Sequence, residues 1–271
     1  MARNIVITGG TRGIGQGMAR EFLRRGHHVC MTGRSQRSVD EGLQGLKADA
    51  GEAKLIGIPC EVADLGQVQA VWDGAASEFG GVDIWINNAG IANLMQDFDA
   101  IEKQEYDNVV NTNIIGTFNG CKVALIGMKR QGHGQIYNFE GFGSDGRIGN
   151  GLSIYGTTKR AVTYFTDALI KEYKDSPVNI GFLSPGIVIT NMTLTEADHL
   201  PPERWEKTKR IYNIIADKVE TVTPWLVEAT LADFGKHGSR LAWLNTPKAM
   251  GRFFKAFVLR QKRDLFAGLD A

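Results

Sequence analysis

Tyr155 and Lys159 are four positions apart in the stretch Tyr155-Gly-Thr-Thr-Lys159. On a helix this spacing puts both side chains on one face, one turn apart. A free tyrosine has a pKa of about 10, too high for efficient proton transfer near neutrality, and a neighbouring ammonium lowers that pKa because it favours the phenolate. The pair therefore predicts a general acid/base, the alternative being an ordinary surface pair.

A glycine-rich stretch near the N-terminus is typical of a dinucleotide site. Residues 8–15 read TGGTRGIG, between an apolar run and a helical pattern. Glycines let the backbone approach a pyrophosphate closely, and the following helix offers free N–H groups and the positive end of its dipole. We expect this site rather than a merely structural turn, with contacts from Gly9, Thr11, Arg12, Gly13, Ile14 and Gly15.

The end of the second predicted strand indicates which dinucleotide binds. A carboxylate there would accept hydrogen bonds from the adenosine ribose of NAD, but Gly33 supplies none. Arg34 follows it and Arg12 lies in the glycine turn, and guanidinium groups suit a 2′-phosphate. We therefore expect NADPH/NADP in preference to NAD. Asp64, after the third strand, either faces the adenine amino group or caps a helix.

Alternating elements must position these groups. Nearly wholly apolar runs of strand length alternate with amphipathic stretches of helical period. This predicts an α/β fold: a doubly wound, Rossmann-type parallel sheet within a three-layer α/β/α arrangement. The expected strands are 4–8, 28–32, 54–59, 82–87, 134–139, 178–183 and 240–244, and the expected helices are 15–25, 39–49, 64–79, 101–128 with a break, 156–173, 203–217 and 224–233.

Length and composition narrow the class of protein further. We expect one domain over residues 1–271. A formal net charge of +1 gives no attraction to nucleic acid. The three cysteines form no CxxC pair and no metal spacing with the five histidines, so we expect single buried thiols and no metal. No signal peptide or apolar run of transmembrane length is visible, which predicts a cytoplasmic protein.

Six pieces of the sequence resemble the short-chain dehydrogenases/reductases over residues 4–190. They are TGGTRGIG (8–15), Asp64, NNAG (87–90), Asn113, YGTTK (155–159) and PGIVIT (185–190). The resemblance implies a nicotinamide-dependent oxidoreductase in which Tyr155 is the catalytic acid/base, Lys159 its partner, and Asn113 the holder of a helix kink and a proton-relay water. It implies further coenzyme contacts from Asn88, Ala89, Gly90, Tyr155, Lys159, Pro185, Gly186 and Thr190, and we expect a homo-oligomer, either a dimer or a tetramer.

A narrower set of motifs is similar to the chlorophyll b reductase branch of that family. These are IYNFEGFGSDGR (136–147), YGTTKRAV (155–162) and LSPGIVITNM (183–192). In that branch a short acidic-Gly motif, here Glu140-Gly141, stands where most relatives carry a serine that donates a hydrogen bond to the substrate oxygen. Losing one such donor costs roughly 100- to 1,000-fold in rate.

Three accounts of the missing hydroxyl are open. Ser144 swings in from its glycine-rich loop; or the N–H groups of 141–143 act as donors and the absent side chain makes room for a bulky substrate; or the protein binds NADP without much catalysis. We interpret Glu140 as a solvated or coenzyme-adjacent carboxylate, with direct proton transfer as the alternative.

Substrate preference is predicted to lie in residues 142–153 and in a lid near 191–217, which follow strand ends. Their apolar side chains favour a large apolar carbonyl compound, although Trp205 and Ile211 alternatively just pack the lid helix on the body. The apolar residues are Leu152, Met192, Leu194, Leu200 and Trp205.

The tail near 248–271 is basic and amphipathic. Met250, Phe253, Phe254, Phe257 and Val258 fall at helical spacing among lysines and arginines. We expect this helix to dock on its own domain or on a sister subunit, with peripheral membrane contact as the alternative.

Taken together, the residues and the resemblance predict an NADPH-dependent reductase of a formyl or keto group on a hydrophobic small-molecule substrate. The 7-formyl group of chlorophyll(ide) b is the sharpest choice, on resemblance alone. A reductase of another hydrophobic ketone or aldehyde, such as an oxo-lipid or steroid-like compound, and a non-catalytic NADP-binding sensor are the alternatives.

Overall fold

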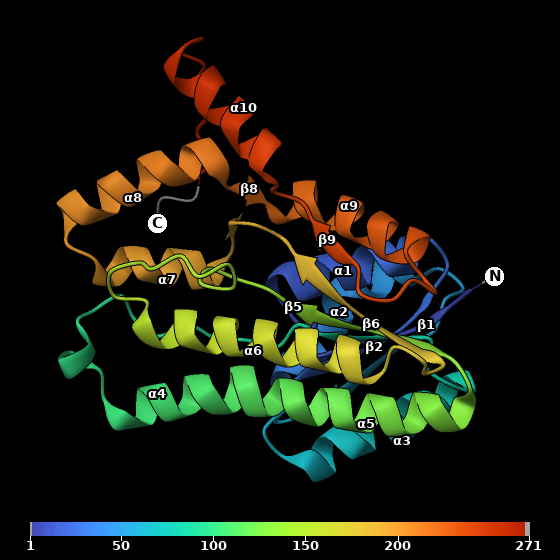
Figure 1. The fold of residues 1–271 in the computed structure, drawn as a ribbon. Coiled ribbons are helices and arrows are strands. Elements are labelled where there is room, and N and C mark those ends of the chain that lie inside the picture. Colours follow the sequence, from blue (N-terminus) through green and yellow to red (C-terminus); the bar gives the residue numbers. More distant parts are fainter. Residues whose placement is uncertain (1, 269–271) are drawn as a thin grey trace.

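The structure, a computed structural model, describes residues 2–268 apart from the side chains of 196–198, so the last three residues of the predicted tail lie outside the described part. Seven strands form one sheet in the order β3-β2-β1-β4-β5-β6-β9 (Figure 1). Every neighbouring pair is parallel, which confirms the predicted doubly wound sheet. The strands are β1 Asn4–Ile7, β2 His28–Gly33, β3 Leu55–Pro59, β4 Ile84–Asn87, β5 Gly134–Phe139, β6 Val178–Ser184 and β9 Arg240–Ala242.

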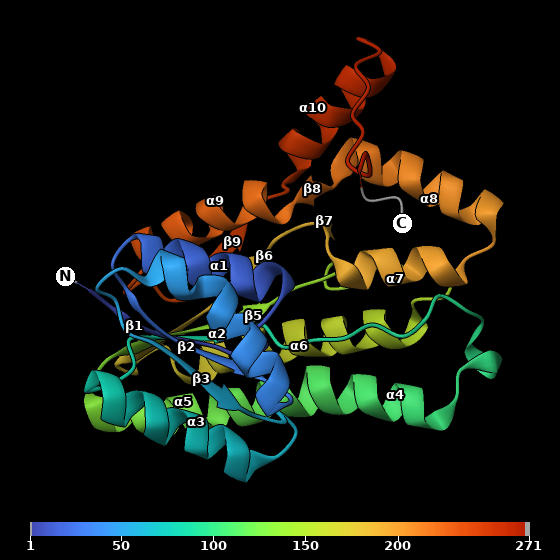
Figure 2. The same ribbon diagram turned by 180° about the vertical axis from the view of Figure 1, so that it is seen from behind.

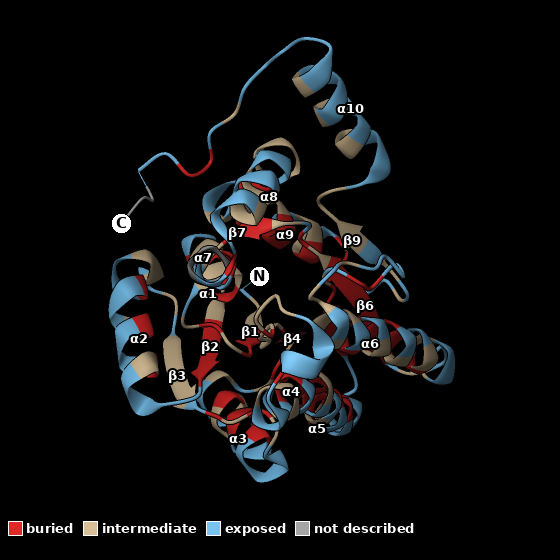
Figure 3. Ribbon diagram, turned by 90° about the vertical axis from the view of Figure 1, so that its left-hand side faces the viewer, coloured by how far each residue is buried: buried red, intermediate tan, exposed pale blue. Residues whose placement is uncertain are grey.

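Helices cover both faces of the sheet (Figures 1 and 2). On one face α1 contacts both α2 and α9, and on the other α3 contacts α5, with α6 against β6. The end-on view of Figure 3 shows the buried strands between these layers. The helices are α1 Gly13–Arg24, α2 Gln36–Ala50, α9 Val219–Ala232, α3 Leu65–Phe79, α5 Gly116–Gln131 and α6 Ser153–Glu172.

Alternate strand residues supply two separate apolar cores, because successive side chains of a strand point to opposite faces. Val6 and Trp85 pack with Trp72 of α3 in one core. Ile5 and Ile7 join the other core, beneath α1 and α9. A sheet buried on both faces explains why the strands are nearly all apolar.

The predicted break in the long helix is a π-helical turn over Asn111–Ile115, between α4 (Lys103–Val110) and α5. A short 3₁₀ turn, Phe98–Ala100, precedes α4. Single π turns are rare and concentrate at functional sites. The turn places Asn113 in the interior.

The region after Pro185 is more ordered than the sequence indicates. The loop signals of 191–201 contain a helix, α7 (Asn191–His199), and Pro202 then begins α8 (Pro202–Ile215) at a position that suits proline. Two short strands, β7 (Val188–Ile189) and β8 (Asp217–Lys218), pair beside the lid, and the tail forms α10 (Thr246–Phe257). Among residues 2–268, no helix has both the length and the apolar character that crossing a bilayer requires.

Candidate active site

Tyr155 and Lys159 lie one turn apart at the start of α6. The Lys159 Nζ is 5.8 Å from the centroid of the Tyr155 ring, so the two side chains share one face of the helix. Lys159 also reaches the end of β5, where its Nζ donates to the Phe139 carbonyl oxygen at 3.2 Å. The predicted pair thus stands at the carboxyl edge of the parallel sheet, where ligands bind in folds of this type.

Lys159 is buried, and its charge state depends on two opposing influences. Burial lowers the pKa of Lys159 to about 8, while the nearby Glu140 carboxylate raises it. The side chain is therefore mostly an ammonium at neutral pH. A cation held this close to a phenol is the arrangement that an acid/base role for Tyr155 requires.

Asn113 ties the π turn to both sides of the site. Its Nδ2 donates to the Ile91 carbonyl oxygen at 2.9 Å and to Thr158 Oγ1 at 3.0 Å, and its Oδ1 accepts from the Ile91 N–H at 2.9 Å. Thr158 Oγ1 donates in turn to the Tyr155 carbonyl oxygen at 2.7 Å. The expectation that Asn113 holds a helix kink agrees with these contacts, and the relay water stays a prediction.

Asn93 is a supporting residue that the sequence did not reveal. Its Oδ1 accepts from the Tyr155 N–H at 3.1 Å, and its Nδ2 donates to the Gly151 carbonyl oxygen at 2.9 Å. It therefore satisfies a backbone donor in the first turn of α6. The two partners are 62 and 58 positions away in the chain, so no local pattern could have identified Asn93.

Gly141 occupies the place beside the Tyr155 hydroxyl. A Cβ added there would overlap the Tyr155 Oη and lie 3.1 Å from Lys159 Cε. Any side chain at position 141 would therefore push the phenol aside. The glycine that replaces serine therefore allows the Tyr155 hydroxyl to occupy its observed position.

Ser144 is held in the loop that follows β5. Its Oγ accepts from the Gly141 N–H at 3.1 Å and donates to the Lys159 carbonyl oxygen at 3.4 Å, and the side chain is buried. Ser144 would have to break these contacts to reach a substrate. The Gly141 N–H is engaged as well, which removes it from the backbone donors of the second account.

Glu140 is buried, which contradicts the solvated alternative of its interpretation, whereas its place beside the coenzyme stays a prediction. Its Oε1 lies 3.5 Å from Arg240 Nη2 and accepts no hydrogen bond from residues 2–268. Burial raises the pKa of Glu140, and the Arg240 guanidinium opposes that rise. The solvated alternative was wrong, and no local pattern indicates the contact with Arg240, which comes from β9, the strand beside β6, 100 positions further along the chain.

The glycine turn is shaped to receive a pyrophosphate. Gly9 and Gly13 have φ values of +63° and +56°, which favour glycine. The Arg12 side chain at the N-cap makes no capping hydrogen bond, so it leaves the first N–H groups of α1 available to an anion. A Cβ on Gly13 would lie 3.5 Å from Thr190 Cγ2, which places the 185–190 segment against this turn.

The residues predicted to contact the coenzyme after β4 lie against the same turn. Asn88 Nδ2 donates to the carbonyl oxygens of Thr8 and Gly9 at 2.9 and 3.0 Å, and the Ala89 N–H donates to Thr8 Oγ1 at 3.1 Å. A Cβ on Gly90 would lie 3.6 Å from Lys159 Nζ. The structure therefore joins the glycine turn to the Tyr155–Lys159 pair through residues 88–90, and their coenzyme contacts stay a prediction.

The adenosine end has no room for an acidic side chain at position 33. A Cβ on Gly33 would lie 2.6 Å from Ser38 Oγ and 2.7 Å from Thr11 Cγ2. Arg12 and Arg34 are both exposed, and neither forms an ion pair with any residue from 2 to 268. Their guanidinium groups remain available to an anion.

Asp64 is the N-cap of α3. Its carboxylate accepts from the Gln67 N–H at 3.1 Å and from Gln67 Nε2 at 3.2 Å, and these bonds lower the pKa of Asp64. Of the two roles considered for this residue, the capping role is observed. An adenine contact stays a prediction.

The lid consists of α7 and α8. Trp205 packs edge-on against Phe266, with ring centroids 5.3 Å apart, in a cluster that also contains Ile189 and Ala216. Trp205 therefore packs the lid, the alternative considered for it, whereas Ile211 stays half exposed. Met192 remains exposed and available to a substrate.

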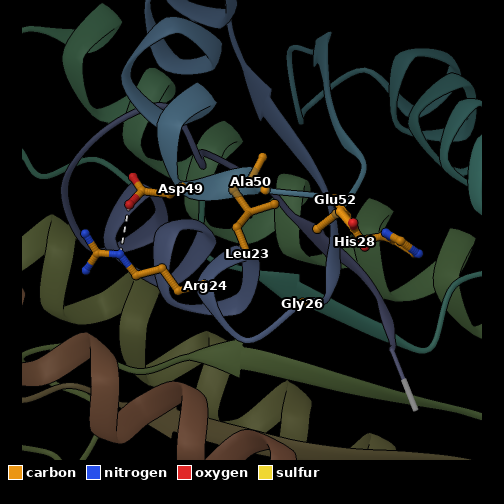
Figure 4. Close-up of a pocket in the computed structure, with 9 residues that line it drawn as sticks. Leu23, Arg24, Gly26, His28, Asp49, Ala50 and Glu52 are labelled. Carbon is orange, nitrogen blue, oxygen red and sulfur yellow. Dashed lines mark hydrogen bonds and ion pairs between the residues drawn. The ribbon is translucent and has the colours of Figure 1, made fainter.

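A shallow hollow between the C-terminal ends of α1 and α2 lies elsewhere (Figure 4). Its residues adjoin the start of β2, at the edge of the sheet opposite to Tyr155. Asp49 there is paired with Arg20 at 3.0 Å and with Arg24 at 2.8 Å. The Asp49 carboxylate is thus engaged in ion pairs, which makes the hollow a poor candidate for catalysis.

Known proteins resemble this chain over most of its length. The family model described as short chain dehydrogenase matches residues 3–200. The chain is 32% identical over 276 residues to chlorophyll(ide) b reductase NOL of Oryza sativa subsp. japonica, covering 98% of this chain and 78% of that protein. It is 33% identical over 264 residues to probable chlorophyll(ide) b reductase NYC1 of Arabidopsis thaliana, covering 92% of this chain and 52% of that one, so it spans about half the length of that relative.

A solved structure shows the same fold. The crystal structure of a short-chain type dehydrogenase/reductase from Mycobacterium marinum matches with a TM-score of 0.77 and 27% identity, covering 89% of this chain and 93% of that one. The family model covers well over half of the chain, and the sheet order, the glycine turn and the Tyr155–Lys159 pair agree with it. The chain belongs to the short chain dehydrogenase family of oxidoreductases.

Proposed function

We propose that this protein is an NADPH-dependent reductase that transfers hydride to a formyl or keto group of a large apolar substrate. The observation that carries the proposal is the buried Lys159 ammonium beside Tyr155, at the carboxyl edge of the sheet and joined to the glycine turn. The similarity to NOL and NYC1 supports the 7-formyl group of chlorophyll(ide) b as the substrate group.

A bound dihydronicotinamide would supply the hydride. The residues of the chain would donate the proton and hold the reacting groups in position. The Tyr155 hydroxyl donates its proton to the carbonyl oxygen as negative charge develops there, and the Lys159 ammonium stabilises the phenolate that remains. Asn113 and Asn93 keep α6 in register with the loop after β4 by the hydrogen bonds described above.

Ser144 and Gly141 argue against the account in which Ser144 replaces the missing hydroxyl. Ser144 Oγ is occupied by the loop itself, and no side chain fits between position 141 and the Tyr155 hydroxyl. The exposed Phe142 and Met192 are suited to a flat apolar substrate. These exposed apolar side chains favour a bulky formyl compound over a small charged one.

The coenzyme preference rests on two exposed cations and on the lack of space at Gly33. Arg12 and Arg34 suit a 2′-phosphate, and a ribose-binding carboxylate has no room at position 33. Replacing Arg34 by alanine should therefore raise the KM for NADPH about 10- to 100-fold and change that for NADH little. Arg37→Ala is the matched control, because Arg37 is equally exposed and pairs with Glu41.

The decisive experiment incubates the purified protein with NADPH and chlorophyllide b and follows both pigment absorbance and NADPH oxidation. The proposal predicts a blue-shifted product formed in proportion to the NADPH consumed. Tyr155→Phe should abolish the reaction while NADPH still binds. Tyr164→Phe, on the same helix but exposed, should react like the wild type.

Other outcomes separate the alternatives. NADPH oxidation only with other hydrophobic ketones or aldehydes would replace the pigment substrate by a different apolar carbonyl. Tight NADPH binding without turnover on a broad carbonyl panel would mean that the protein is a coenzyme-binding sensor, and it would refute the proposed catalysis.

A further inference from the structure

The C-terminal projection, which we define as residues 246–263, extends beyond the layers that flank the sheet (Figures 1 and 3). It consists of α10 and the segment that returns from its tip. No residue of α10 is buried. The expectation that this helix docks on its own domain is therefore not met for its apolar side.

The exposed side of the projection is apolar. The side chains of Phe254, Phe257 and Met250 are 55%, 71% and 67% exposed, and Val258 and Leu259 continue the surface at the tip. Phe253 stacks on Phe257, with ring centroids 6.1 Å apart. Their positions repeat at helical spacing, so they form one continuous stripe. Contiguous exposed apolar surface of this kind marks an interaction site.

The charge around the stripe has one sign. Residues 245–263 contain no aspartate or glutamate, in a chain whose formal net charge is only +1. Lys255, Arg260 and Lys262 are exposed and pair with no carboxylate among residues 2–268. The complementary surface is therefore anionic as well as apolar.

A buried carboxylate fixes both ends of the projection. Asp217 accepts from Arg252 Nη2 at 2.6 Å near the start and from Arg263 Nη2 at 2.7 Å at the return. Arg252 and Arg263 also donate to carbonyl oxygens at the end of α8. The projection is thus held in one orientation beside the lid, which reduces the entropy lost when it binds a surface.

From these contacts we infer that the C-terminal projection docks on an anionic lipid surface, with its phenylalanine stripe in the headgroup region and its lysines and arginines against lipid phosphates. Amphipathic helices with this composition lie in bilayer interfaces. A symmetric contact with a second copy is less suitable, because it would bring the same unpaired cations together. The inference needs no substrate and does not rest on the proposed reductase activity.

Vesicle sedimentation of the full chain tests the inference. The protein should pellet with vesicles of equal parts phosphatidylcholine and phosphatidylglycerol, pellet less with phosphatidylcholine alone, and be released by salt. Removing one cation by Lys255→Gln or Lys262→Gln should weaken binding about fivefold each. The double variant Phe254→Ser/Phe257→Ser should weaken it at least about tenfold.

Phe98→Ser is the matched control, since Phe98 is also exposed but lies on the 3₁₀ turn before α4. It should pellet like the wild type, and urea unfolding should show that all variants are folded. Equal sedimentation of wild type and double variant, or no sedimentation with anionic vesicles, would overturn the inference. A dimer in light scattering that the double variant converts to a monomer, without vesicle binding, would overturn it in favour of an interface between copies.

Discussion

Gly141 shows how a single residue without a side chain sets the geometry of the site. Its backbone lies against the Tyr155 hydroxyl, and a Cβ would overlap the phenol. Gly141→Ala should therefore displace the hydroxyl and lower kcat roughly 10- to 100-fold, with little effect on coenzyme affinity. Steady-state kinetics with coenzyme titration measure this. Gly156→Ala is the control, because its Cβ would meet only Gly143 Cα at 3.9 Å. Wild-type turnover in Gly141→Ala would show that the glycine does not set the position of the Tyr155 hydroxyl.

Lys159 and Glu140 together set the pH dependence. The proposed mechanism needs the Lys159 ammonium, so kcat/KM for reduction should fall as pH rises past the Lys159 pKa of about 8. Because the Glu140 carboxylate raises that pKa, Glu140→Gln should move the fall to lower pH. A pH–rate profile from pH 6 to pH 10 measures it. Asp167→Asn removes a more distant and exposed partner of Arg240, and it should leave the midpoint of the pH–rate profile unchanged. A shift to higher pH in Glu140→Gln would refute the influence of Glu140 on Lys159.

At the scale of elements, the π turn is the device that brings the loop after β4 to α6. Asn113 makes three side-chain hydrogen bonds there, two of them partly buried and one, to Thr158, fully buried. Asn113→Ala should lower the free energy of unfolding by about 2–4 kcal/mol, because it leaves the Ile91 backbone groups unpaired. Urea unfolding measures this. Asn108→Ala, on the exposed side of α4, should change stability by less than about 0.5 kcal/mol, and equal losses in both variants would contradict the role given to the turn.

For the whole molecule, Asp217 joins the lid, β9 and the C-terminal projection. It accepts from Trp243 Nε1 at 2.6 Å in addition to Arg252 and Arg263, and it is buried. Asp217→Ala should cost about 3–5 kcal/mol of stability, because it leaves two guanidinium groups without their carboxylate. Limited proteolysis should then cut within residues 246–263. Asp175→Ala, which removes an exposed carboxylate, is the control, and an unchanged cleavage pattern in Asp217→Ala would show that other contacts hold the projection.

The sequence by itself determined the parallel sheet, the order of its elements, the glycine turn and the Tyr155–Lys159 pair. Each depends on local period or spacing: strands apolar on both faces, glycines between a strand and a helix, and two residues one helical turn apart. The element bounds moved by a few residues, and α7 was missed because its pattern is mixed with loop signals.

Only the tertiary structure decided which distant residues meet. Arg252 and Arg263 reach Asp217 across 35 and 46 positions, Asn93 reaches Tyr155 across 62, and Arg240 covers Glu140 from another strand. A periodic pattern reports which face of an element is apolar, but it does not specify the partner that covers that face or leaves it open. For this reason the tertiary structure was needed to show that the apolar stripe of α10 is exposed and that Glu140 is buried.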